Sequence, residues 1–138
     1  MRGVMFASMA ASVLLAASPA WACRIPATPE RLAAAYERQL ERADQVLVGE
    51  VSGKLLWEHA AYGVELTSVR ALRGAAPEEM TVESEPIVTC MPNFTAELAR
   101  IDFERVLILL SGGEPLSIHR IDSDFARSAL ARLDTNAE

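Results

Sequence analysis

The stretch QVLVGEV, residues 45–51, decides the fold of this chain. Its apolar residues form a short, nearly continuous run rich in β-branched side chains, which is typical of a strand buried on both faces. A second strand is expected at residues 105–110, which are all apolar after Arg105, and it stops at Ser111-Gly112-Gly113. We therefore expect two buried strands in a mainly β domain.

The residues around these runs predict three further strands. Apolar and polar side chains alternate at 62–66, and the apolar phase flips after Thr67-Ser68, which predicts a bulge or sharp bend there. That strand ends at Arg73-Gly74. The remaining strands are expected at 80–85 and at 116–121, while 54–60 either extends the first strand or forms a hairpin tip, and 91–103 is irregular or a short helical turn.

Two helices are expected to flank the strands. Thr28-Pro29-Glu30 combines an N-cap, a proline in the first turn and an acidic residue at the helix start, and apolar residues then recur at helical spacing to residue 43. Ser123 is expected to cap a terminal helix that runs through Leu133. The sequence thus predicts a single domain over residues 23–138, mainly β, with about five strands and an N-terminal and a C-terminal helix.

Residues 1–22 have the pattern of a signal peptide. Arg2 precedes an uncharged apolar run, and Ala20-Trp21-Ala22 predicts cleavage after Ala22. Of the 138 residues, 116 then remain, with 12 basic and 19 acidic side chains and a net charge of −7. We expect a periplasmic or secreted protein. Its acidic balance argues against nucleic acid as a partner.

The cleaved chain would begin at Cys23 and contain one other cysteine, Cys90. An even cysteine count without a C-x-x-C motif, in an exported chain, predicts one structural disulfide. A bond closing this loop would stabilise the fold by roughly 4 kcal/mol. In the alternative interpretation Cys23 carries a lipid anchor, as in outer-membrane lipoproteins, and only then would the chain bind a membrane.

The order of these features resembles the netrin-like module, specifically the N-terminal domain of the tissue inhibitors of metalloproteinases. The resemblance covers residues 23–121, and it rests on Cys23, the stretch 43–51, the end of the bent strand at 72–74, Cys90 and the apolar strand 106–109. It implies a five-stranded barrel of the oligonucleotide/oligosaccharide-binding type, with attached helices and a Cys23–Cys90 disulfide. The chain departs from the family in beginning Cys23-Arg24-Ile25 rather than C-x-C, and in having Met91 after the second cysteine.

The resemblance also implies one way to act on another protein. In these inhibitors the free amine and carbonyl of the N-terminal cysteine bind the zinc of a protease, and the next side chain enters the specificity pocket. Cys23 and Arg24 would take these positions, so zinc-protease inhibition is one hypothesis for this chain.

The residues themselves favour a non-enzymatic binding module of the bacterial cell envelope. No G-x-S-x-G or H-E-x-x-H motif occurs, and His59 and His119 stand apart from any catalytic pattern, so we predict no catalytic residues, resident metal or cofactor. Leu55, Leu56 and Trp57 would form an apolar hairpin tip. That tip either folds back on the core or binds a partner, which we expect to be a protein or an envelope component.

Overall fold

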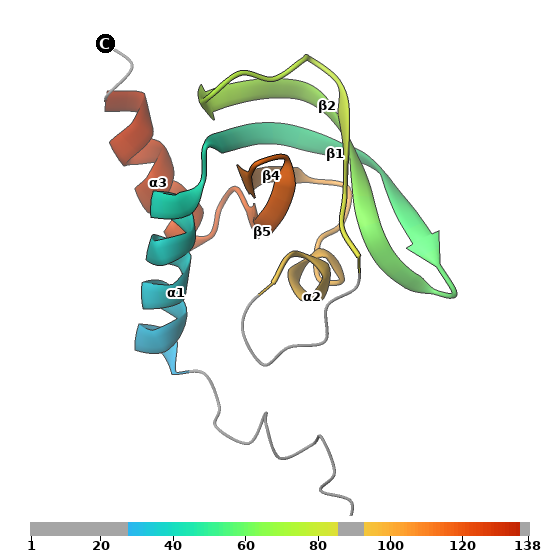
Figure 1. The fold of residues 1–138 in the computed structure, drawn as a ribbon, viewed down its shortest axis with the longest axis horizontal. Coiled ribbons are helices and arrows are strands. Elements are labelled where there is room, and N and C mark those ends of the chain that lie inside the picture. The colour runs from blue at the N-terminus through green and yellow to red at the C-terminus, as the bar shows by residue number, and fades with distance from the viewer. Residues whose placement is uncertain (1–27, 86–92, 136–138) are drawn as a thin grey trace, which may run out of the picture.

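The computed structural model describes residues 28–85 and 93–135, and within them the chain forms five strands and three helices (Figure 1). In chain order these are α1 (Pro29–Arg42), β1 (Gln45–Trp57), β2 (Ala60–Arg73), β3 (Met80–Glu83), α2 (Phe94–Leu98), β4 (Arg105–Ser111), β5 (Glu114–Arg120) and α3 (Asp124–Thr135). The prediction of a mainly β domain with flanking helices is confirmed. No helix in these residues is long and apolar enough to span a bilayer.

All five strands belong to one antiparallel sheet, in the order β3-β2-β1-β4-β5. The two buried runs of the sequence, in β1 and β4, lie next to each other in it. Closing this sheet into a barrel would require a ladder between its edges, β3 and β5. Cα atoms of the two edges come within 8 Å, but the ladders of the described residues do not include that pair, so the barrel stays a prediction.

Two hydrophobic clusters explain why β1 and β4 are apolar on both faces. On the inner side of the curved sheet, Leu47 and Ile108 pack with Phe94 and Leu98 of α2. On the outer side, Val46, Val48, Leu107 and Leu109 pack against α1 and α3. Figure 1 shows these two helices side by side at one end of the molecule. Burial from both sides therefore fixes the centre of the sheet.

The predicted bend in β2 is confirmed. Val48 pairs with Arg70 but Glu50 pairs with Thr67, so β2 carries one more residue than β1 in this interval. Ser68 there has a φ of 51°. The extra residue reverses which side chains face the core, because side chains of a strand alternate between its faces. A second register shift, between Val51 and Gly53, bends β1 in turn.

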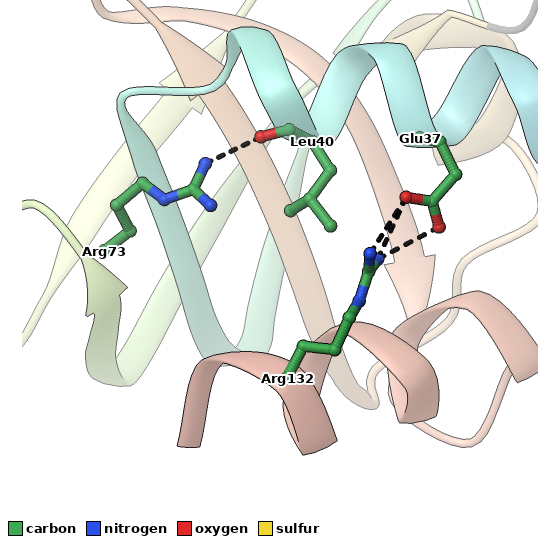
Figure 2. A network of polar contacts seen from close by, with 4 residues as sticks. All are labelled: Glu37, Leu40, Arg73 and Arg132. Atoms are coloured by element: carbon green, nitrogen blue, oxygen red, sulfur yellow. Dashed lines mark hydrogen bonds and ion pairs between the residues drawn. The ribbon is translucent and has the colours of Figure 1, made fainter. Parts of the chain in front are cut away.

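Helix α1 begins and ends at specific contacts. The Thr28 hydroxyl accepts a hydrogen bond from the Arg31 amide at 3.2 Å, as a cap should. At the other end, Arg73 Nη1 donates to the Leu40 carbonyl at 2.6 Å (Figure 2) and to the Ala43 carbonyl at 2.8 Å. The end of β2 therefore closes the last turn of α1.

The junction between α1 and β1 is also fixed by two turns. Gly74 has a φ of 75°, and a Cβ atom there would lie 2.8 Å from the Asp44 carbonyl. The Asp44 carboxylate accepts a hydrogen bond from the Gly112 amide, at 3.0 Å, in the turn between β4 and β5. Segments 43–51 and 72–74, quoted above for the resemblance, thus meet at this junction.

Two expectations left open in the sequence are resolved. β1 continues to Trp57, so residues 54–60 both extend the strand and form the hairpin tip. Part of 91–103 is helical, as α2. The predicted signal segment, Cys23, Arg24 and Cys90 lie outside the described residues.

Candidate functional site

The β1–β2 hairpin ends in a two-residue turn, on the side of the molecule away from α1 and α3 (Figure 1). Trp57 pairs with Ala60, and the two residues between them, Glu58 and His59, have φ values of 46° and 74°. Such values suit the twist of a tight hairpin but are usually taken by glycine or asparagine. This turn is therefore built from two residues that rarely adopt its backbone conformation.

The predicted apolar tip divides into one packed and two exposed residues. Leu55 is half-buried, and its Cδ1 atom lies over Gly63, 2.9 Å from the position of a Cβ there. Leu56 and Trp57 are 62% and 70% exposed. The alternative that Trp57 folds back on the core is thus wrong. The tip presents two large apolar side chains to solvent.

The base of the hairpin is held against the end of α2 and the connection that leads from α2 to β4. The Lys54 ammonium donates to the Leu98 carbonyl at 3.2 Å, and the Val51 amide donates to the Glu104 carbonyl at 3.0 Å. Phe103, one residue before Glu104, is 72% exposed. These contacts give the exposed tip a rigid support.

A second cluster, which was not among the sites expected from the sequence, lies where α1, α2, β5 and α3 meet. His119 Nε2 and Ser117 Oγ are 2.9 Å apart and both side chains are buried. The His119 ring lies edge-on to Tyr36, with centroids 4.6 Å apart, and 4.5 Å from the ring of Phe125. On the other side of the imidazole, Glu97 Oε2 is 3.8 Å from Nδ1.

The protonation of this cluster follows from its burial. Desolvation raises the pKa of Glu97 to about 7, against hydrogen bonds from the Ile118 amide and the Tyr36 hydroxyl that lower it. Burial lowers the pKa of His119 to about 4. Burial, together with the Glu97 charge, raises the pKa of Tyr36 to about 12. A separation of 3.8 Å between Glu97 and His119 permits an ion pair. In mildly acidic solution, however, these pKa shifts leave Glu97 protonated and His119 unprotonated, so both side chains are neutral.

The order Ser117, His119, Glu97 is that of a nucleophile, a base and an orienting acid. A nucleophile must reach its substrate, however, and the Ser117 side chain has no exposed surface. Glu97 Oε1 is buried without a hydrogen-bond partner among the described residues. What the geometry supports is a polar contact that joins α1 and α2 to β5.

Only one signal in the sequence pointed to this cluster. Ser117 and His119 are two residues apart in a predicted strand, which places them on one face. Nothing in the spacing associates them with Glu97 or Tyr36, because tertiary packing brings these residues together. His119, expected to be a surface or hydrogen-bonded group, is buried and hydrogen-bonded.

The described residues contain no group of three or more His, Cys, Asp or Glu side chains arranged to hold a metal ion. Comparison of the chain with protein-family models, with curated proteins and with solved structures gives no match.

Proposed function

We propose that this protein is an exported, non-enzymatic binding module that holds another protein, or an envelope component, with the tip of its β1–β2 hairpin. The observation that carries the proposal is the exposure of Leu56 and Trp57, at 62% and 70%, beyond the body of the domain. Exposed aromatic residues are enriched among those that dominate the energy of protein interfaces. The N-terminal pattern of residues 1–22 supports export.

The hairpin is already ordered before binding, so a partner can bind it with little loss of the hairpin's conformational entropy. A two-residue turn fixes the tip, and Lys54 and Val51 fix its base. A partner would therefore meet an apolar surface that is already ordered, and less of the binding energy would be spent on ordering it. We infer that the strained Glu58-His59 turn serves to aim Leu56 and Trp57 outward.

The proposal is tested by photo-cross-linking in the natural host. A photoreactive amino acid replaces Trp57 in one variant and Glu114 in a control variant. Glu114 is exposed beside the β4–β5 turn, at the α1 end of β1 and thus at the opposite end of that strand from the tip. The proposal predicts a discrete adduct from position 57 and none from position 114. Equal adducts from both positions, or none from position 57, would contradict it.

A further inference from the structure

The outer side of the β1–β2 hairpin lies away from α1 and α3, which cover the outer side of the sheet at the centre of β1 and β4 (Figure 1). Residues opposite each other in a ladder share a side of the sheet. Val64 and Val82 pair with each other and belong to the inner cluster. Their neighbours in each strand therefore lie on the outer side. These are Leu55, Gly63 and Glu83 in one row, and Gly53, Glu65 and Thr81 in the next.

Two glycines on this outer side are crossed by side chains of their neighbours. Glu65 Oε2 lies 2.5 Å from the position of a Cβ at Gly53, so its carboxylate leans across the β1 backbone. Leu55 Cδ1 and Glu83 Cβ lie 2.9 Å and 3.0 Å from the position of a Cβ at Gly63. Leu55 is therefore beside Glu83 and one row away from Glu65.

Trp57 extends the apolar part of this side toward the turn. The register shift between Leu55 and Leu56 leaves the extra residue in β2, so β1 keeps its alternation. Leu56 pairs with Ala61, which packs against the inner cluster, and Trp57 then lies on the same side as Leu55. We call the surface formed by these last two residues with Glu65 and Glu83 the outer hairpin face.

The charges of this part of the chain are uneven. From the start of β1 to the end of β3 the sequence contains six glutamates and three basic residues. All three cations are engaged: Lys54 with a carbonyl of α2, Arg70 with a carboxylate of α3, and Arg73 with carbonyls at the end of α1. Glu65 and Glu83 are exposed, and neither forms an ion pair with another described residue.

This charge argues against two occupants of the outer hairpin face. A twofold symmetric dimer would bring Glu65 and Glu83 of both copies into one interface, where like charges repel. An anionic lipid surface would be repelled for the same reason. A protein surface that carries arginine or lysine would instead meet carboxylates that lack a cation among the described residues.

We propose that the outer hairpin face binds a protein surface with an apolar centre, which receives Leu55 and Trp57, and with arginine or lysine at its margin, opposite Glu65 and Glu83. Arginine suits this position best, because its planar guanidinium can donate two parallel hydrogen bonds to one carboxylate. The apolar centre supplies most of the affinity, and the exposed carboxylates speed association and select the partner. The inference rests on the function proposed above and states the chemistry of the partner.

The test adds charge reversal to the photo-cross-linking at position 57 in the natural host. One variant carries Glu65→Lys with Glu83→Lys. The matched control carries Glu41→Lys with Glu114→Lys, which changes the net charge equally at exposed residues outside the hairpin. The adduct yield should fall about tenfold or more in the first variant and stay within about twofold in the control.

A neutral pair, Glu65→Gln with Glu83→Gln, should give an intermediate yield. This pair keeps nearly the shape of the glutamates, so it decides the question if melting temperatures show that the lysine pair disturbs the fold. Equal yields in the hairpin variants and the control would overturn the inference. So would an adduct with the mass of two copies of the chain, or an adduct to lipid or polysaccharide.

These outcomes separate the inference from the proposed function. Equal yields would leave the tip as a binding site, held through apolar contact alone. The absence of any adduct from position 57 while all the glutamates are intact would instead overturn the proposed function, and the inference with it.

Discussion

Glu97 of α2 and His119 of β5 hold one proton between them, with Oε2 and Nδ1 3.8 Å apart in a buried site. On unfolding, the proton moves from the carboxyl to the imidazole, because a solvated Glu is the stronger acid of the two. Between about pH 4.5 and pH 6.5, folding therefore replaces the charged pair of the unfolded chain with a neutral pair, without net uptake of protons by these residues.

The two residues should consequently make opposite contributions to the pH dependence of stability. The folded pKa of Glu97 is raised, so its contribution is greatest below pH 4.5 and is lost as pH rises to about 7. The folded pKa of His119 is lowered, so its contribution is present above pH 6.5 and is lost as pH falls to about 4. As the pH rises from 4.5 to 7, the free energy of unfolding of Glu97→Gln should increase relative to that of the wild type. As the pH rises from 4 to 6.5, the free energy of unfolding of His119→Asn should decrease relative to that of the wild type.

Each change is expected to be on the order of 3 kcal/mol in the free energy of unfolding. The measurement is urea unfolding of the wild type and both variants at several pH values, with the variant-minus-wild-type difference plotted against pH. Parallel curves for all three proteins would show that Glu97 and His119 titrate in the folded state as they do in the unfolded chain.

Arg73 should contribute more to stability than an ordinary surface arginine. Its Nη1 donates to the carbonyls of Leu40 and Ala43 at the end of α1, and the residue is half-buried. Arg73→Met should cost about 2 kcal/mol, because two helix carbonyls lose a charged donor. Arg70→Met is the matched control, since its contact with Asp134 joins two exposed side chains, and it should cost less than about 1 kcal/mol. Equal costs in thermal or urea unfolding would refute the capping role.

The salt bridge between Glu37 and Arg132, which joins α1 and α3 in Figure 2, is expected to matter less. Both side chains are nearly half exposed, at 43% and 49%. Arg132→Gln should therefore shift the free energy of unfolding by less than about 1 kcal/mol, and by less still in 0.5 M salt. A larger, salt-independent loss would mean that Arg132 contributes through packing rather than charge.

Gly74 and Gly112 both have positive φ, but only one is crowded. A Cβ at Gly74 would lie 2.8 Å from the Asp44 carbonyl, whereas one at Gly112 would have nothing within 4 Å. Gly112→Ala should cost about 1 kcal/mol from backbone strain alone. Gly74→Ala should cost clearly more, because the α1–β1 junction must also move. Equal melting temperatures for the two variants would contradict this account of the junction.

The sequence predicted the parts of the fold that depend on local pattern. The runs at 45–51 and 105–110, the Thr28 cap and the bend at 67–68 each carry their signal in a few neighbouring residues. The pairing of β1 with β4 could not be predicted from periodicity alone. Glu97 was missed because its role depends on the packing of α2 against β5. The length of β1 was left open because an apolar hairpin tip and a buried strand have the same pattern of apolar residues in the sequence.

The most direct test of the central claim is the affinity of the partner identified by cross-linking for Trp57→Ala, measured by calorimetry beside the wild type. If Leu56 and Trp57 form the binding tip, the affinity should fall about 30-fold or more. The melting temperature should stay within about 2 °C of wild type, because Trp57 is exposed. An unchanged affinity would contradict the claim, and a large fall in melting temperature would show that Trp57 belongs to the folded core instead.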